Sequence, residues 1–142
     1  GGGRLHEDIE ILFSGKKYFT QVVRGREACD MPSRRWNKPS IMLTCEANYS
    51  NAHGTPWVYK HRQMGKLVGA PVPGTMTSVN WVRMQDPDLI YGIPVIGYHL
   101  PDGSYLEPDV YVLNAPETVV KGEDTQLKAA VDELLKELDA KK

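Results

Sequence analysis

The sequence has few cysteines and little net charge, and it contains no long hydrophobic run. Its 2 cysteines form neither a CxxC pair nor a Cys/His spacing typical of zinc ligands. The 17 Lys and Arg residues nearly balance the 18 Asp and Glu residues, whereas general nucleic-acid binders carry a strong basic excess. A membrane helix needs about 20 apolar residues, and no apolar run comes near that length. No signal-peptide pattern is present. We therefore expect no metal or other cofactor, no nucleic-acid partner and no membrane span. The cysteines leave the compartment, cytoplasmic or exported, open.

The remaining composition is typical of one α/β domain. Hydrophobic residues make up 41% and charged residues 25% of 142 residues, a length that predicts a single domain. Strand patterns interleave with helical ones, which favours a layered α/β domain. Strands are expected at 18–23, 40–45, 66–69, 75–84, 93–100 and 105–113, and helices at 5–12, at 51–63 and after Asp124.

Three local features qualify this assignment. Residues 25–39 are polar and contain two prolines, which predicts a long loop. Pro56 is expected in the first turn of its helix, where a missing N–H costs little. Asp124 is expected to cap the last helix, which carries an apolar stripe at helical spacing.

A candidate catalytic serine lies where a buried strand leads into a helix. The run 41–53 is Ile-Met-Leu-Thr-Cys-Glu-Ala-Asn-Tyr-Ser-Asn-Ala-His. The N–H of Asn51, at the helix start, would face an oxygen held beside Ser50, which is the logic of a nucleophile elbow. The flanking glycines of Gly-x-Ser-x-Gly are absent, and an N-cap serine is the ordinary alternative. His53 is too close in the turn to act as base and is expected at the surface or as a cap.

Several motifs, in order along nearly the whole chain, resemble the catalytic region of tricorn-type serine peptidases, in the superfamily of carboxy-terminal-processing peptidases. They are Glu-Ala-Asn-Tyr-Ser-Asn-Ala-His-Gly at 46–54, Gly-Lys-Leu-Val-Gly at 65–69, Pro-Val-Pro-Gly-Thr at 71–75, Pro-Asp-Val-Tyr-Val at 108–112 and Gly-Glu-Asp-Thr-Gln-Leu-Lys-Ala-Ala-Val at 122–131. The leading three glycines resemble the end of the family's Arg-x-Asn-Gly-Gly-Gly segment. The resemblance implies a ClpP/crotonase-like ββα-type layered domain, with residues 1–142 forming the C-terminal part of the catalytic core.

The resemblance also assigns roles to individual residues. It implies that Ser50 is the nucleophile, that the Asn51 N–H is one oxyanion donor, and that Gly1 or Gly2 supplies the other. The processing branch has a base lysine after the Gly-rich turn, where this chain has Gly-Thr-Met at 74–76, so the tricorn branch is favoured. In that branch a Ser/His/Ser/Glu tetrad takes its histidine and second serine from an upstream segment, which none of the four histidines here matches.

The glutamate of the tetrad has one candidate. Glu107 follows the Asp-Gly turn at 102–103, where the family's glutamate is sought, but Pro108 comes immediately after it. Glu107 is therefore either the catalytic acid or a later glutamate brought up by a deletion.

These roles imply a serine peptidase that works through an acyl-enzyme. The resemblance implies a peptide or unfolded polypeptide as substrate and a homo-oligomer as the assembly. Without a base in this chain, we expect residues 1–142 alone to be inactive. The missing base and the shortened Glu107 region motivate an alternative, a non-catalytic peptide-binding or assembly module that keeps the peptidase fold.

Overall fold

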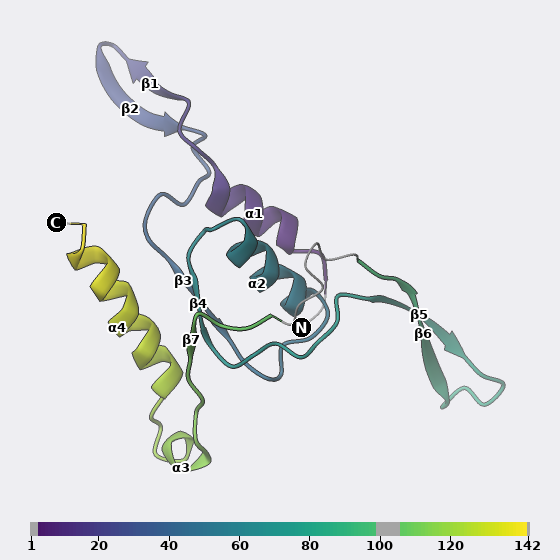
Figure 1. Ribbon diagram of the computed structural model, residues 1–142. Helices are drawn as coiled ribbons and strands as arrows, with labels where there is room; N and C mark the ends of the chain where they lie inside the picture. Colours follow the sequence, from purple (N-terminus) through teal and green to yellow (C-terminus); the bar gives the residue numbers. More distant parts are fainter. Residues whose placement is uncertain (1–2, 99–105, 142) are drawn as a thin grey trace.

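The protein consists of helices and strands arranged in layers (Figure 1). The computed structural model describes residues 3–98 and 106–141. Parallel strands joined through a helix form its centre, so the predicted α/β class is confirmed. In these two ranges, no helix is both long and apolar enough to cross a membrane.

The central element is a three-stranded parallel sheet. It has the order β3-β4-β7, built from β3 (Ile41–Thr44), β4 (Lys66–Gly69) and β7 (Val110–Tyr111). Leu67 and Val68 of β4 are fully buried, because the middle strand of a parallel sheet is covered on both faces. The apolar run of β3 was expected to be buried in the same way, but β3 is an edge strand of this sheet and is only partly covered.

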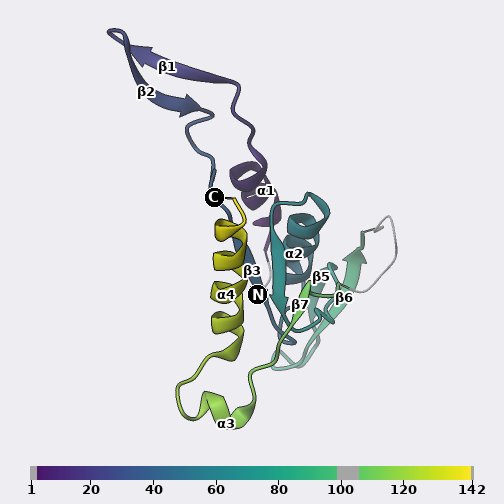
Figure 2. The same ribbon diagram turned by 60° about the vertical axis from the view of Figure 1, so that its left-hand side comes forward.

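Helices cover both faces of this sheet. Helix α2 (Asn51–His61) connects β3 to β4 and packs on one face, with α1 (His6–Ser14) beside it. Figure 2 shows α4 (Thr125–Asp139) on the opposite side, reached through the short α3 (Pro116–Val119). The core cluster comprises Tyr59, Leu67, Val72 and Leu106, with Phe13, Met42, Trp57 and Met64 packed against it.

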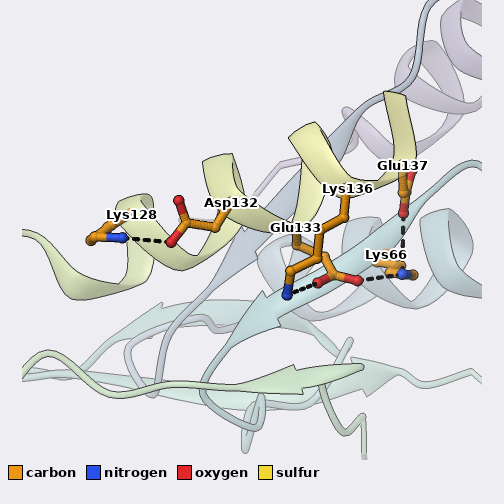
Figure 3. Close-up of polar contacts among 6 residues, drawn as sticks. All are labelled: Lys66, Lys128, Asp132, Glu133, Lys136 and Glu137. Atoms are coloured by element: carbon orange, nitrogen blue, oxygen red, sulfur yellow. Dashed lines mark hydrogen bonds and ion pairs between the residues drawn. The ribbon is translucent and has the colours of Figure 1, made fainter. Parts of the chain in front are cut away.

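Ion pairs accompany the packing of α4 on the sheet (Figure 3). Lys66 Nζ of β4 lies 2.5 Å from Glu133 Oε1 and 3.4 Å from Glu137 Oε1. The hydrogen bond to Glu133 raises the pKa of Lys66, and the same bond lowers the pKa of Glu133. Because the Lys66 side chain is 42% exposed, solvent screens these pairs, and they contribute little to stability.

Helix α4 begins at the predicted cap. Asp124 Oδ1 accepts a hydrogen bond from the Leu127 N–H at 2.9 Å and another from Asn114 Nδ2 at 3.0 Å. These bonds lower the pKa of Asp124, the one from Leu127 most of all. Ala130 is buried against the sheet, whereas much of the apolar stripe remains exposed, namely Leu127, Val131, Leu135 and Leu138.

Two antiparallel hairpins extend away from the sheet (Figure 1). One pairs β1 (Phe19–Val23) with β2 (Arg26–Met31), and the other pairs β5 (Ser78–Arg83) with β6 (Ile90–Ile96). The predicted loop over 25–39 is therefore wrong in its first part. Strand β2 has little apolar character, and its extended state depends on pairing with β1 across the two-residue turn at Arg24 and Gly25, both with positive φ, a hairpin signal that the prediction did not use.

Pro56 lies inside α2 rather than in its first turn, so that prediction is wrong. A proline lacks the N–H that would bond the carbonyl four residues earlier, which here belongs to Ala52. Asn48 Nδ2 donates to this carbonyl at 2.9 Å. A side chain from the turn before the helix thus replaces the missing donor.

Candidate active site

Ser50 immediately precedes α2 and has an uncommon backbone conformation. Its φ is 58° and its ψ is −122°. A positive φ is rare for a residue with a side chain, and the associated strain of about 1–3 kcal/mol is found mainly at functional sites. A nucleophile elbow imposes this kind of strained strand-to-helix turn on its serine. The backbone therefore favours the elbow interpretation, although the flanking glycines are absent.

The Ser50 hydroxyl does not cap α2. Ser50 occupies the N-cap position, yet its side chain makes no capping hydrogen bond within the described part of the chain, so the N-cap alternative is wrong for this hydroxyl. The N–H of Ala52 bonds the Tyr49 carbonyl at 3.1 Å, and the N–H of His53 bonds that of Ser50 at 2.9 Å. For the Asn51 N–H, no acceptor is found among the residues described. A hydroxyl and an N–H donor thus stand together at the positive end of the helix dipole.

A small cavity lies beside Ser50. Its volume is about 20 Å³, enough for about one water molecule. It is lined by Gly3, Arg4, His6, Ser50, Asn51, Met76, Thr77, Ser78 and Tyr98. The N-terminal segment, the start of α2 and the start of β5 therefore meet at the candidate nucleophile.

Met76 in this lining stands in the Gly-Thr-Met turn, where the resemblance places a base lysine in the processing branch. This turn packs directly against Asn48 and Tyr49, the two residues before Ser50. A Cβ added to Gly74 would lie 2.7 Å from both Asn48 O and Tyr49 Cα, so this close approach requires glycine. Met76 of this turn therefore lies beside Ser50, and its thioether cannot act as a general base.

Asn51 and His6 form a contact that the sequence did not reveal. Asn51 Oδ1 accepts a hydrogen bond from the Leu5 N–H at 3.0 Å, and Asn51 Nδ2 lies 2.7 Å from His6 Nδ1. A backbone N–H only donates, so the amide oxygen faces Leu5 and the amide nitrogen faces the imidazole. His6 Nδ1 must then be the acceptor, and the ring proton of neutral His6 is on Nε2. The only signal in the sequence was a histidine close to the leading glycines.

His53 is buried, with 8% of its surface exposed, and the expectation of a surface or capping role is wrong. Burial in the first turn of α2 lowers the pKa of His53, because the charged imidazolium loses its hydration. Its Nδ1 has no hydrogen-bond partner among the described residues. His53 is not among the residues that line the cavity beside Ser50, and its exclusion as the base stays a prediction.

Glu107 is exposed and lies on the segment before β7. Its main-chain carbonyl accepts a hydrogen bond from Lys60 Nζ of α2 at 2.8 Å. Glu107 is not among the residues that line the cavity beside Ser50, and its role as the catalytic acid stays a prediction. Gly1 and Gly2 lie outside the described residues.

The cysteines stand apart from each other. Cys29 is exposed on β2, and Cys45 is half-buried with its Sγ 3.1 Å from Asn48 Oδ1. Within residues 3–98 and 106–141, no group of three or more His, Cys, Asp or Glu side chains could hold a metal ion.

Comparison with known families decides where the chain belongs. The model of peptidase family S41 matches residues 1–112. The chain belongs to peptidase family S41. This match covers both the leading glycines and the Ser50 region, and membership in a peptidase family supports a peptidase function in general. No curated protein matches this S41 chain.

Solved structures show the same fold. The crystal structure of the tricorn protease matches 98% of this S41 chain with a TM-score of 0.83 and 24% sequence identity. A proposed peptidase from Parabacteroides merdae matches 80% of the chain with a TM-score of 0.52 and 21% identity, over 38% of its own length. The S41 chain spans 14% of the tricorn protease. The predicted resemblance to tricorn-type peptidases is thus confirmed in family and fold.

Proposed function

We propose that this chain carries the nucleophile and part of the oxyanion hole of a serine-type peptidase. One observation carries the proposal: the strained turn at Ser50 leaves its hydroxyl uncapped beside the unpaired N–H of Asn51, within the described residues of an S41 chain. A strained serine at a helix N-terminus supports covalent catalysis, because it combines an accessible nucleophile with a preorganised donor.

The reaction proposed is acyl transfer to Ser50. Its Oγ attacks the scissile carbonyl carbon, and its proton passes to a general base. The carbonyl oxygen becomes an oxyanion that accepts hydrogen bonds from the Asn51 N–H and from an N–H of the Gly1–Gly3 segment. Collapse of this intermediate breaks the C–N bond, the amine leaves with the proton, and water then hydrolyses the acyl-enzyme.

The general base is proposed to come from outside these 142 residues. His6 lines the same cavity, but its Nδ1 accepts from Asn51 and its Nε2 carries the ring proton, so neither nitrogen is free to take the Ser50 proton. Residues 1–142 alone are therefore expected to hydrolyse no peptide, and Glu107 stays the proposed acid of the tetrad.

The substrate proposed is a peptide or an unfolded polypeptide, and the working assembly a homo-oligomer. Support for the substrate comes from the exposed hairpin strand β5, which begins at the cavity and could pair with an extended peptide. The exposed apolar side chains of α4 and β6 support an assembly through these surfaces.

The test is covalent labelling of the full-length protein with a fluorophosphonate, followed by mapping of the modified serine by mass spectrometry. We expect modification at Ser50, loss of labelling in Ser50→Ala, and unchanged labelling in Ser33→Ala, a control at an exposed serine between β2 and β3. Peptide hydrolysis should fall at least about 10³-fold in Ser50→Ala. Hydrolysis without labelling of Ser50 would refute the proposal, and absence of both would favour the non-catalytic binding module.

A further inference from the structure

Asn51 contacts the N-terminal segment and also begins α2. The side chain is 4% exposed, so water competes little for its hydrogen bonds. Its partners, Leu5 and His6, lie 46 and 45 positions earlier in the chain. Thr55 Oγ1, one turn further along α2, also donates to Asn51 Oδ1 at 3.3 Å and holds the carboxamide in this orientation. The carboxamide is therefore a fixed link between two distant parts of the sequence.

This link lies where the proposed oxyanion hole requires precise geometry. Gly3 lines the cavity with Ser50 and has a φ of +116°, a conformation that glycine adopts freely. Glycine backbone has many accessible conformations, so a glycine segment needs an external contact to hold its N–H groups toward a reacting oxygen. A misplacement of about 1 Å at such a site can lower the rate about 10²-fold.

A second contact between α1 and α2 is independent of Asn51 and His6. Arg62 Nε, at the end of α2, donates to Glu10 Oε1 of α1 at 2.6 Å. This ion pair, together with the packing of Phe13 on the core, holds the later part of α1 in place. Loss of the Asn51–His6 contact would therefore loosen the leading end of α1 and the glycine next to it, while the helix stays attached.

We propose that the Asn51 carboxamide and the His6 imidazole are a positioning pair, which holds the chain just after Gly3 against the first turn of α2 and so fixes Gly3 and Asn51, both of which line the cavity beside Ser50. The inference rests on the proposed function. Neither side chain takes part in bond making: Asn51 acts through its own backbone N–H, and His6 acts through Asn51.

The decisive comparison is His6→Asn against His6→Leu in the full-length protein. Asparagine places an amide oxygen near the position of imidazole Nδ1 and can accept from Asn51 Nδ2, whereas leucine has a similar size and no acceptor. With a peptide substrate, His6→Leu is expected to lower kcat about 10- to 100-fold and to change KM less than about twofold, because the lost contact acts on the transition state. His6→Asn is expected to recover most of kcat.

Two further measurements separate positioning from general stability. His61→Leu, at an exposed histidine near the end of α2, should leave kcat unchanged, and urea unfolding of each variant gives its free energy of unfolding. If His6→Leu does not fold, Asn51→Ala replaces it, since alanine keeps the backbone N–H and removes the same link.

Failure of the positioning pair can be distinguished from failure of the proposed function. Equal kcat values for His6→Leu and the wild type, or equal losses in His6→Leu and His6→Asn, would overturn the positioning pair while Ser50 is still labelled. A rise in KM at constant kcat would also overturn it, since it would place His6 in substrate binding. If wild-type Ser50 does not react with the fluorophosphonate, the proposed function fails, and the inference fails with it.

Discussion

Replacing Ser50 with glycine separates the chemical role of this residue from the strain in its backbone. A side chain at φ 58° and ψ −122° costs about 1–3 kcal/mol, a cost that glycine avoids. Glycine instead loses about 0.5–1 kcal/mol through its greater freedom in the unfolded chain. The hydroxyl makes no capping bond to the described residues, so its removal costs little. We therefore expect Ser50→Gly to raise the free energy of unfolding by roughly 1 kcal/mol, and Ser50→Ala to change it by less than about 0.5 kcal/mol.

The assay is urea unfolding of the purified chain followed by circular dichroism, with thermal unfolding as a second measure. A gain of about 1 kcal/mol corresponds to a rise in Tm of roughly 3 °C for a chain of this length. Both variants should lose fluorophosphonate labelling in the full-length protein, so stability and labelling change independently. Ser33→Gly, at an exposed position with an ordinary φ, should lower the free energy of unfolding, because glycine has more freedom in the unfolded chain. If Ser50→Gly is no more stable than Ser50→Ala, the turn is unstrained and the elbow interpretation is wrong.

Substitutions at Gly69, His53 and Asp124 test three further predictions by urea unfolding. Gly69→Ala should lower the free energy of unfolding by about 3 kcal/mol, because φ is +134° and the new Cβ would overlap the Thr44 carbonyl oxygen. Gly122→Ala is the control: φ is +76° with open space around it, so this substitution should cost about 1 kcal/mol. Equal costs for the two substitutions would contradict the predicted overlap. The pKa of His53 is lowered from 6.5, so below pH 6.5 the unfolded chain binds a proton that the folded chain excludes, and stability falls until the folded pKa is reached. His53→Gln should reduce this decline between pH 7 and 5, and an unchanged slope would exclude His53 as its source. Asp124→Ala should cost about 1 kcal/mol through loss of the cap, and Asp124→Asn, which keeps an acceptor, should cost less.

The elements that local patterns predicted are those whose cause is local. The apolar runs of β3 and β4 and the capped, amphipathic α4 were all expected near their observed positions. Strand β2 was missed because its extended state depends on pairing with β1, and Pro56 was misplaced because the Asn48 side chain supplies the missing donor. Both effects depend on a partner a few residues away along the chain, which the propensity of the single element does not record.

The same distinction holds for the candidate site. The position of Ser50 before a helix, the start of that helix at Asn51 and the resemblance to a peptidase family could all be predicted from the sequence, because these features depend on short runs of residues. The contact of His6 with Asn51 across 45 positions, and the burial of His53, became visible only in the folded chain. Both outcomes follow from how the helices pack, α1 beside α2 and α2 on the sheet. The free energy of that packing is shared among many residues, so no single motif records it.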